Sequence, residues 1–86
     1  MSEYKEIVLL YEYCKRIGVF ATLKPFLDGF CIIFQNGGDV VQHFGSYGSK
    51  SGCVEFAIGS KKDYNAVSLK NAKALIRKYK QTLNRK

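Results

Sequence analysis

The spacing of apolar residues changes twice along the 86-residue chain, and this change restricts the possible folds more than any other feature. Up to residue 17, apolar residues recur every three or four positions, as they do on one face of a helix. Residues 19–58 hold short runs rich in β-branched and aromatic residues, and helical spacing returns after Ser68. This order predicts one α+β domain over residues 1–86, in which an N-terminal and a C-terminal helix pack on one face of a three- or four-stranded antiparallel sheet.

Both predicted helices carry signals at their ends. The first is predicted over residues 3–17, with Ser2 as N-cap and Gly18 as a left-handed C-terminal stop. After a polar turn at residues 59–63, the last helix is predicted to start behind Ser68, although an N-cap at Asp63 would begin it earlier. The expected buried faces are Tyr4, Ile7, Val8, Tyr11, Cys14 and Ile17 in the first helix, and Leu69, Ala72, Leu75, Ile76, Tyr79 and Leu83 in the last.

The segment between the helices indicates strands at residues 19–24, 30–34, 40–44 and 53–58. The first should be short or at an edge, because Pro25 follows it and Asp28-Gly29 marks a turn. The second is apolar at every position, as in a strand with both faces covered. The fourth alternates between apolar and polar positions, which predicts a half-exposed strand. Residues 45–52, rich in glycine and serine, predict a loop.

The net positive charge of the chain comes from its last quarter. Residues 1–63 hold seven basic and seven acidic side chains, whereas residues 64–86 hold seven basic and no acidic ones, which accounts for the formal net charge of +7. Like charges at helical spacing repel by a few tenths of a kcal/mol per pair, so an acid-free basic stripe favours an anionic partner. Nucleic acid fits this pattern, because neutralising its phosphates releases condensed counterions.

The sequence therefore predicts a non-enzymatic nucleic-acid-binding domain, without a choice between DNA and RNA. The expected contacts come from the last helix, the turn before it and the serine-rich loop. They are Lys70, Lys73, Arg77 and Lys80 of the helix, Lys61 and Lys62 of the turn, and Lys50 and Tyr47 of the loop. Tyr13 and Tyr47 lie outside the apolar stripes and are candidates for base stacking.

Two other interpretations of the basic stripe remain open. It is compatible with a solvated helix face. It is also compatible with a small protein-binding adaptor or inhibitor, of the kind that mobile elements encode, whose basic helix faces an acidic protein surface. A membrane contact is not expected, because the apolar face is narrow and no run approaches the roughly 20 apolar residues that span a bilayer.

No pattern for catalysis, a metal or a cofactor stands out, so we expect no enzyme. His43 is the only histidine, and no second metal-binding cluster accompanies it. Residues 48–51 depart from a phosphate-binding loop, because a serine separates Gly48 from Lys50 and a strand is expected to follow. The odd number of widely spaced cysteines predicts free core thiols in a reducing, cytoplasmic location; they are Cys14, Cys31 and Cys53.

The order helix, three strands, helix resembles double-stranded-RNA-binding domains. Gly59-Ser60-Lys61-Lys62 is similar to the basic run that opens the second helix of that family. The resemblance implies lysines that contact phosphates across a groove of the RNA. The chain departs from the family at three points: residues 63–67 separate the basic run from the helix, the glycine-proline-x-histidine loop of the first hairpin is absent, and the strands are spaced differently.

Overall fold

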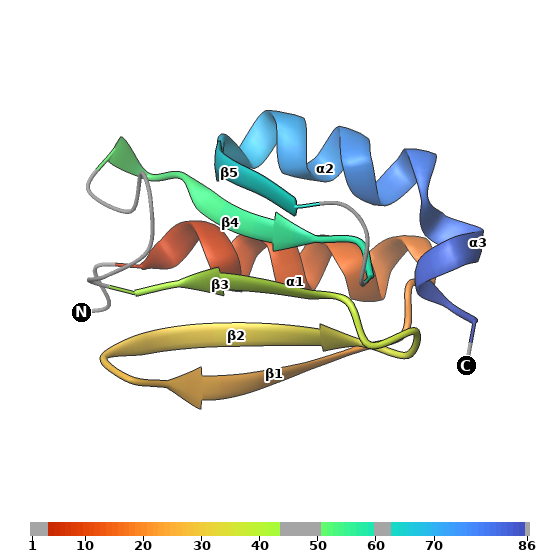
Figure 1. Ribbon diagram of the computed structural model, residues 1–86, viewed down its shortest axis with the longest axis horizontal. Helices are drawn as coiled ribbons and strands as arrows, with labels where there is room; N and C mark the ends of the chain where they lie inside the picture. Colours follow the sequence, from red (N-terminus) through yellow and green to blue (C-terminus); the bar gives the residue numbers. More distant parts are fainter. Residues whose placement is uncertain (1–3, 44–50, 60–62, 86) are drawn as a thin grey trace.

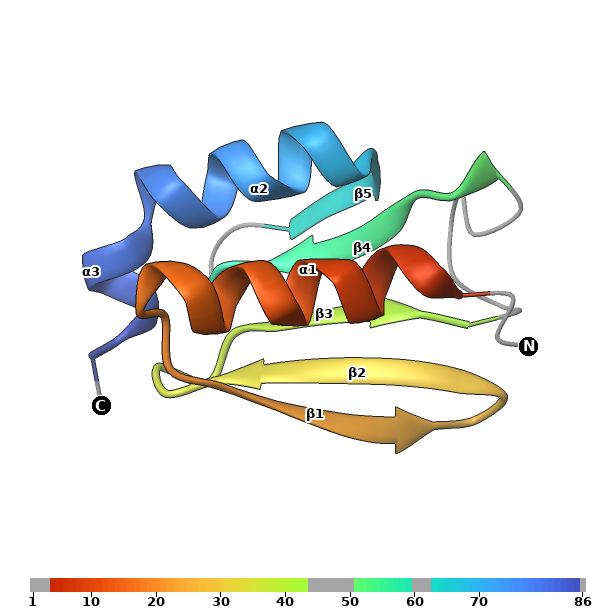
Figure 2. The same ribbon diagram turned by 180° about the vertical axis from the view of Figure 1, so that it is seen from behind.

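The computed structural model describes residues 4–43, 51–59 and 63–85, and it shows one antiparallel sheet with helices on one face. Consecutive strands are neighbours, in the order β1-β2-β3-β4-β5. Figure 1 shows the sheet in front of α1, and Figure 2 shows α1 in front of the sheet with α2 beside it. The elements are α1 (Lys5–Ile17), β1 (Ala21–Phe26), β2 (Gly29–Phe34), β3 (Asp39–Gln42), β4 (Val54–Ala57), β5 (Asp63–Val67), α2 (Leu69–Lys78) and α3 (Lys80–Leu83).

The predicted α+β class and the placement of both helices on one face are confirmed, whereas the sheet has five strands rather than three or four. None of the helices in the described ranges combines the length and the apolar character that crossing a bilayer requires.

The start of α1 is held by a strand instead of by a local cap. The helix begins at Lys5, two residues later than predicted, and the predicted cap Ser2 lies outside the described residues. The N-cap residue is Tyr4, whose side chain makes no capping hydrogen bond. Instead, the Ile7 N–H donates to Gln42 Oε1 of β3 across 3.0 Å. Because the first N–H groups of a helix have no intrahelical acceptor, this contact replaces the missing cap.

The β1–β2 hairpin turns one residue earlier than predicted. Phe26 pairs with Gly29, so the turn residues are Leu27 and Asp28. Leu27 has a left-handed φ of 54° and is 75% exposed. Pro25 lies within β1 rather than after it, which is tolerated because β1 is an edge strand and proline costs no ladder hydrogen bond on the open side.

Strand β5 occupies residues 63–67, so the predicted turn at residues 59–63 does not extend beyond them into a loop, and the alternative in which Asp63 caps an earlier start of the last helix is wrong. It pairs with β4 and carries one extra residue between its paired positions Tyr64 and Val67. Ala66, within this bulge, has a left-handed φ of 56°. The bulge explains why the strand was missed, because an inserted residue interrupts the alternation that identifies strands.

The core lies between the sheet and the helices, and the opposite face of the sheet is open. In β4, Val54 and Phe56 are buried and Glu55 is half-buried, as predicted. The expectation that β2 is covered on both faces is wrong, because Ile33 is 37% exposed on the side away from the helices. Antiparallel sheets tolerate one solvated face. The fully buried core includes Ile7, Leu10, Cys14, Ile32, Val40, Val54, Ala72, Ile76 and Leu83.

Leu83 and Asn84, which we call the latch, hydrogen-bond to two other parts of the fold. Asn84 Oδ1 accepts a hydrogen bond from the Phe20 N–H at 2.7 Å, and Asn84 Nδ2 donates to the Gly18 carbonyl at 3.0 Å. The Leu83 carbonyl accepts from the Asn36 N–H at 3.3 Å. Gly18 is the left-handed C-cap of α1, as predicted, so the latch joins the α1–β1 corner to the β2–β3 turn.

Candidate nucleic-acid interface

The basic stripe predicted for one long helix is divided between two helices. Ser68 caps α2 as predicted, since its Oγ accepts from the Asn71 N–H at 3.2 Å. The helix then breaks at Tyr79, whose φ of −107° and ψ of 19° are not helical. Lys80 therefore begins α3, and its Nζ lies 3.6 Å from the position that a Cβ would take on Gly18. The stripe on α2 consists of three predicted cations rather than four.

Two of these α2 cations converge on a tyrosine of α1. Arg77 Nη1 donates a hydrogen bond to the Tyr13 hydroxyl at 2.9 Å, and Lys73 Nζ lies over the Tyr13 ring, 5.3 Å from its centroid. The Arg16 guanidinium carbon lies over the same ring at 5.5 Å. We call these four residues, Tyr13, Arg16, Lys73 and Arg77, the Tyr13 cluster. Each cation–π contact at such a site contributes about 0.5–1 kcal/mol, which offsets part of the repulsion between the cations.

The packing of α1 beside α2 produces this cluster. The pairs Tyr13/Arg16 and Lys73/Arg77 are each three or four residues apart, so each pair shares one side of its helix. Figure 2 shows the two helices next to each other on the same face of the sheet. Tyr13 is half-buried in the seam between them. The sequence identified Tyr13 and the α2 cations separately, but nothing in the sequence indicated that Arg16 would join them.

The cations of the cluster form no ion pair within the described structure, although Glu12 lies one helical turn before Arg16 on α1. Across residues 4–43, 51–59 and 63–85, no carboxylate forms an ion pair with Arg16, Lys73 or Arg77. Lys70 is exposed on the first turn of α2 and adds to the same basic helix. The other predicted contacts, Lys50, Lys61, Lys62 and Tyr47, lie outside the described residues.

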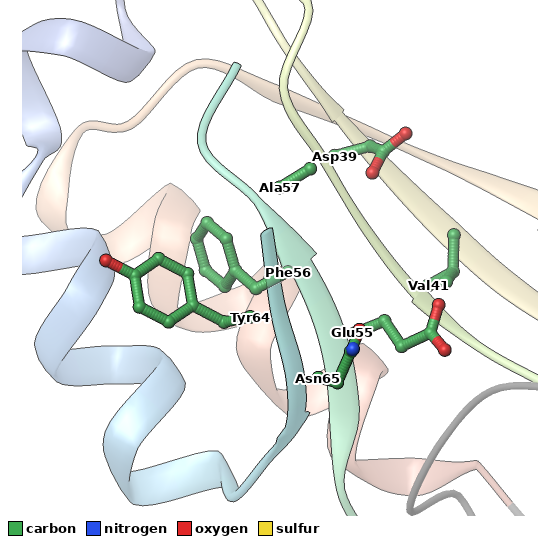
Figure 3. Close-up of a pocket in the computed structure, with 7 residues that line it drawn as sticks. All are labelled: Asp39, Val41, Glu55, Phe56, Ala57, Tyr64 and Asn65. Carbon is green, nitrogen blue, oxygen red and sulfur yellow. The ribbon is translucent and has the colours of Figure 1, made fainter. Parts of the chain in front are cut away.

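The open face of the sheet carries two carboxylates beside a hollow. A hollow of about 180 Å³ crosses β3, β4 and β5 (Figure 3). The carboxylates of Asp39 and Glu55 point away from Phe56 and Tyr64, which lie on the helix side of the sheet (Figure 3). Asp39 and Glu55 thus lie on the face of the sheet opposite to the helices. The hollow is lined by Asp39, Val41, Glu55, Phe56, Ala57, Tyr64 and Asn65.

Of the three predicted core thiols, Cys14 is buried, whereas Cys31 and Cys53 are only half-buried. Burial raises the pKa of the Cys14 thiol to about 12, and burial followed by the nearby Asp39 charge raises the pKa of Cys31. Both thiols are therefore protonated near neutral pH. The His43 ring packs edge-on against Phe26, with centroids 5.2 Å apart. No group of three potential metal ligands occurs among the residues whose positions are described.

No family model, curated protein or solved structure matches the chain. The likeness to double-stranded-RNA-binding domains is also limited by the topology, because five strands separate the two main helices and β5 stands between residues 59–62 and α2. A functional proposal therefore depends on the fold and on the distribution of charge.

Proposed function

We propose that this protein is a non-enzymatic nucleic-acid-binding domain that contacts phosphates through the face formed by α1 and α2. The observation that carries the proposal is the Tyr13 cluster, in which cations from two helices are held together without a carboxylate partner among the described residues. A polyanion relieves their mutual repulsion and releases counterions when it binds.

The proposed footprint extends from the Tyr13 cluster along α2 to Lys70. Lys80 flanks it from α3, and Lys50, Lys61, Lys62 and Tyr47 remain proposed contacts at its periphery. A cytoplasmic location is part of the proposal. The described cysteines are free thiols, which suits a reducing compartment.

Charge reversal on α2 tests the proposal. Fluorescence anisotropy with labelled single- and double-stranded DNA and RNA, measured over a range of salt concentrations, gives the affinity and the number of phosphate contacts. The double variant Lys73→Glu/Arg77→Glu is expected to lose binding but to stay folded, with a melting temperature lower by several degrees, because it removes one cation–π contact and one exposed hydrogen bond and leaves the core intact. The slope of the logarithm of the binding constant against the logarithm of the salt concentration, the salt slope, becomes shallower by about 0.7–0.9 for each lost phosphate contact.

The matched control is Lys15→Glu/Lys24→Glu. It changes the net charge equally, but Lys15 lies over Tyr11 on the β1 side of α1 and Lys24 lies on β1 itself. This variant should retain most of the affinity. Equal binding by the α2 double variant and the wild type would refute the proposal. Absence of binding to all four nucleic acids at physiological salt would also refute it, in favour of the acidic protein partner.

A further inference from the structure

One exposed apolar side chain of α1 lies beside the Tyr13 cluster. Leu9 is 45% exposed and precedes Tyr13 by one helical turn, so the two side chains are neighbours on α1. Within the described ranges, Leu9 is the only large apolar side chain of a helix that is classed as exposed, since Phe20, Phe26, Leu27 and Ile33 lie in turns and strands. Leu9 and Tyr13 thus form a short apolar strip, flanked by Arg16, Lys73 and Arg77.

An apolar strip bordered by cations interacts differently with double-stranded and with single-stranded nucleic acid. A duplex presents phosphates and sugars to a flat helical face and keeps its base faces stacked inside, so an apolar strip gains little there. An unpaired base exposes its whole face, which packs on aromatic, aliphatic or guanidinium surfaces while neighbouring phosphates meet cations. An apolar strip bordered by cations therefore matches a single strand better.

The strip also has suitable dimensions and rigidity. Leu9 and Tyr13 are separated by about 6 Å along the helix axis, which accommodates one or two bases stacked about 3.4 Å apart. The hydrogen bond from Arg77 fixes the Tyr13 hydroxyl, and the planar Arg16 guanidinium lies over the ring. A base can continue this stack on the guanidinium plane, since arginine stacks on aromatic faces.

We propose, on the basis of the nucleic-acid-binding function above, that the ligand is single-stranded. One or two unpaired bases pack on Leu9 and on the Arg16 guanidinium that lies over the Tyr13 ring, and the adjacent phosphates contact Lys73 and Arg77. The inference concerns the strandedness of the ligand and adds no sequence preference.

The test compares a labelled 12-nucleotide single strand with a hairpin duplex of the same base composition. Tyr13→Ala should weaken single-strand binding by roughly 5- to 150-fold, the range found when a stacking residue is truncated. Leu9→Ala should weaken it by about three- to tenfold, because less apolar area is covered. Neither variant changes the charge, so the salt slope should be unchanged in both.

Leu9→Ala and two further variants separate stacking from folding. Leu9→Ala removes an exposed side chain and leaves the core intact, so it keeps the test valid if Tyr13→Ala fails to fold. Tyr13→Phe retains the ring and should bind nearly as tightly as the wild type. Leu27→Ala removes a 75% exposed apolar side chain from the β1–β2 turn and should have no effect.

Tighter binding to the single strand, weakened by Leu9→Ala at an unchanged salt slope, would support the inference. Equal or tighter binding to the duplex, insensitive to Leu9→Ala, would overturn it and leave the proposed function standing. Binding to neither ligand would refute the proposed function itself.

Discussion

Replacing Gln42 by alanine is expected to lower the free energy of unfolding by about 2–5 kcal/mol, although the residue is polar and distant from the basic face. Gln42 is fully buried. Its Oε1 accepts from the Ile7 N–H at 3.0 Å, and its Nε2 donates to Glu6 Oε1 at 3.1 Å and to the Cys53 carbonyl at 3.4 Å. One side chain of β3 therefore joins the first turn of α1 to the segment before β4.

The magnitude has two parts. Alanine leaves the Ile7 N–H without its acceptor, and an unpaired buried donor costs about 1–3 kcal/mol. Truncating the buried Gln42 side chain also leaves a cavity, which adds roughly 1–2 kcal/mol because the surrounding strands relax only in part. The sum of the two parts gives the expected range of about 2–5 kcal/mol.

Gln42→Met separates these two parts. Methionine keeps an unbranched side chain of similar length but cannot accept the hydrogen bond, so only the first part, about 1–3 kcal/mol, should be lost. Gln35 provides the control, because it is exposed at the end of β2 and Gln35→Ala should change stability by less than about 0.5 kcal/mol.

Urea denaturation followed by far-ultraviolet circular dichroism measures these differences, provided that the m-value is unchanged among the variants. A Gln42→Met variant within about 0.5 kcal/mol of the wild type would refute the reasoning, because it would show that the buried hydrogen bonds contribute nothing to stability beyond packing.

Three further predictions concern strain, titration and the latch. Leu27→Gly should raise stability by about 1 kcal/mol, seen as a melting temperature about 4–8 °C higher, because it relieves a left-handed φ at an exposed residue. The pKa of buried Cys14 rises from 9.0 to about 12, so the unfolded state loses its thiol proton first and stability falls above pH 9. Cys14→Ala should flatten that fall by up to about 1.4 kcal/mol per pH unit in urea titrations at pH 9–11. Asn84→Ala should cost about 1–2 kcal/mol in the same assay, because Phe20 N–H and the Gly18 carbonyl lose their partner.

The sequence predicted correctly those elements in which buried residues recur at a regular spacing along a single helix or strand. The α1 and α2 stripes, the Ser68 cap and the alternation in β4 depend on neighbouring residues only. Strand β5 and the break at Tyr79 do not follow from the pattern of neighbouring residues. In β5 a bulge separates Tyr64 from Val67, and at Tyr79 the chain bends although the apolar spacing continues to Leu83.

The candidate site was predictable in part for the same reason. The absence of acidic residues after position 63 pointed to α2, and its spacing placed Lys73 and Arg77 on one side. The meeting of these cations with Tyr13 and Arg16 depends on how two helices far apart in the sequence pack together. Local periodicity carries no information about that contact.

The latch made by Leu83 and Asn84 has a consequence for protein synthesis. Translation delivers these residues after the α1–β1 corner and the β2–β3 turn that they hold, and Leu83 also completes the core. Ribosome-bound chains halted before residue 83 should therefore remain open to proteases, and chains that extend past residue 84 and have emerged fully should become resistant.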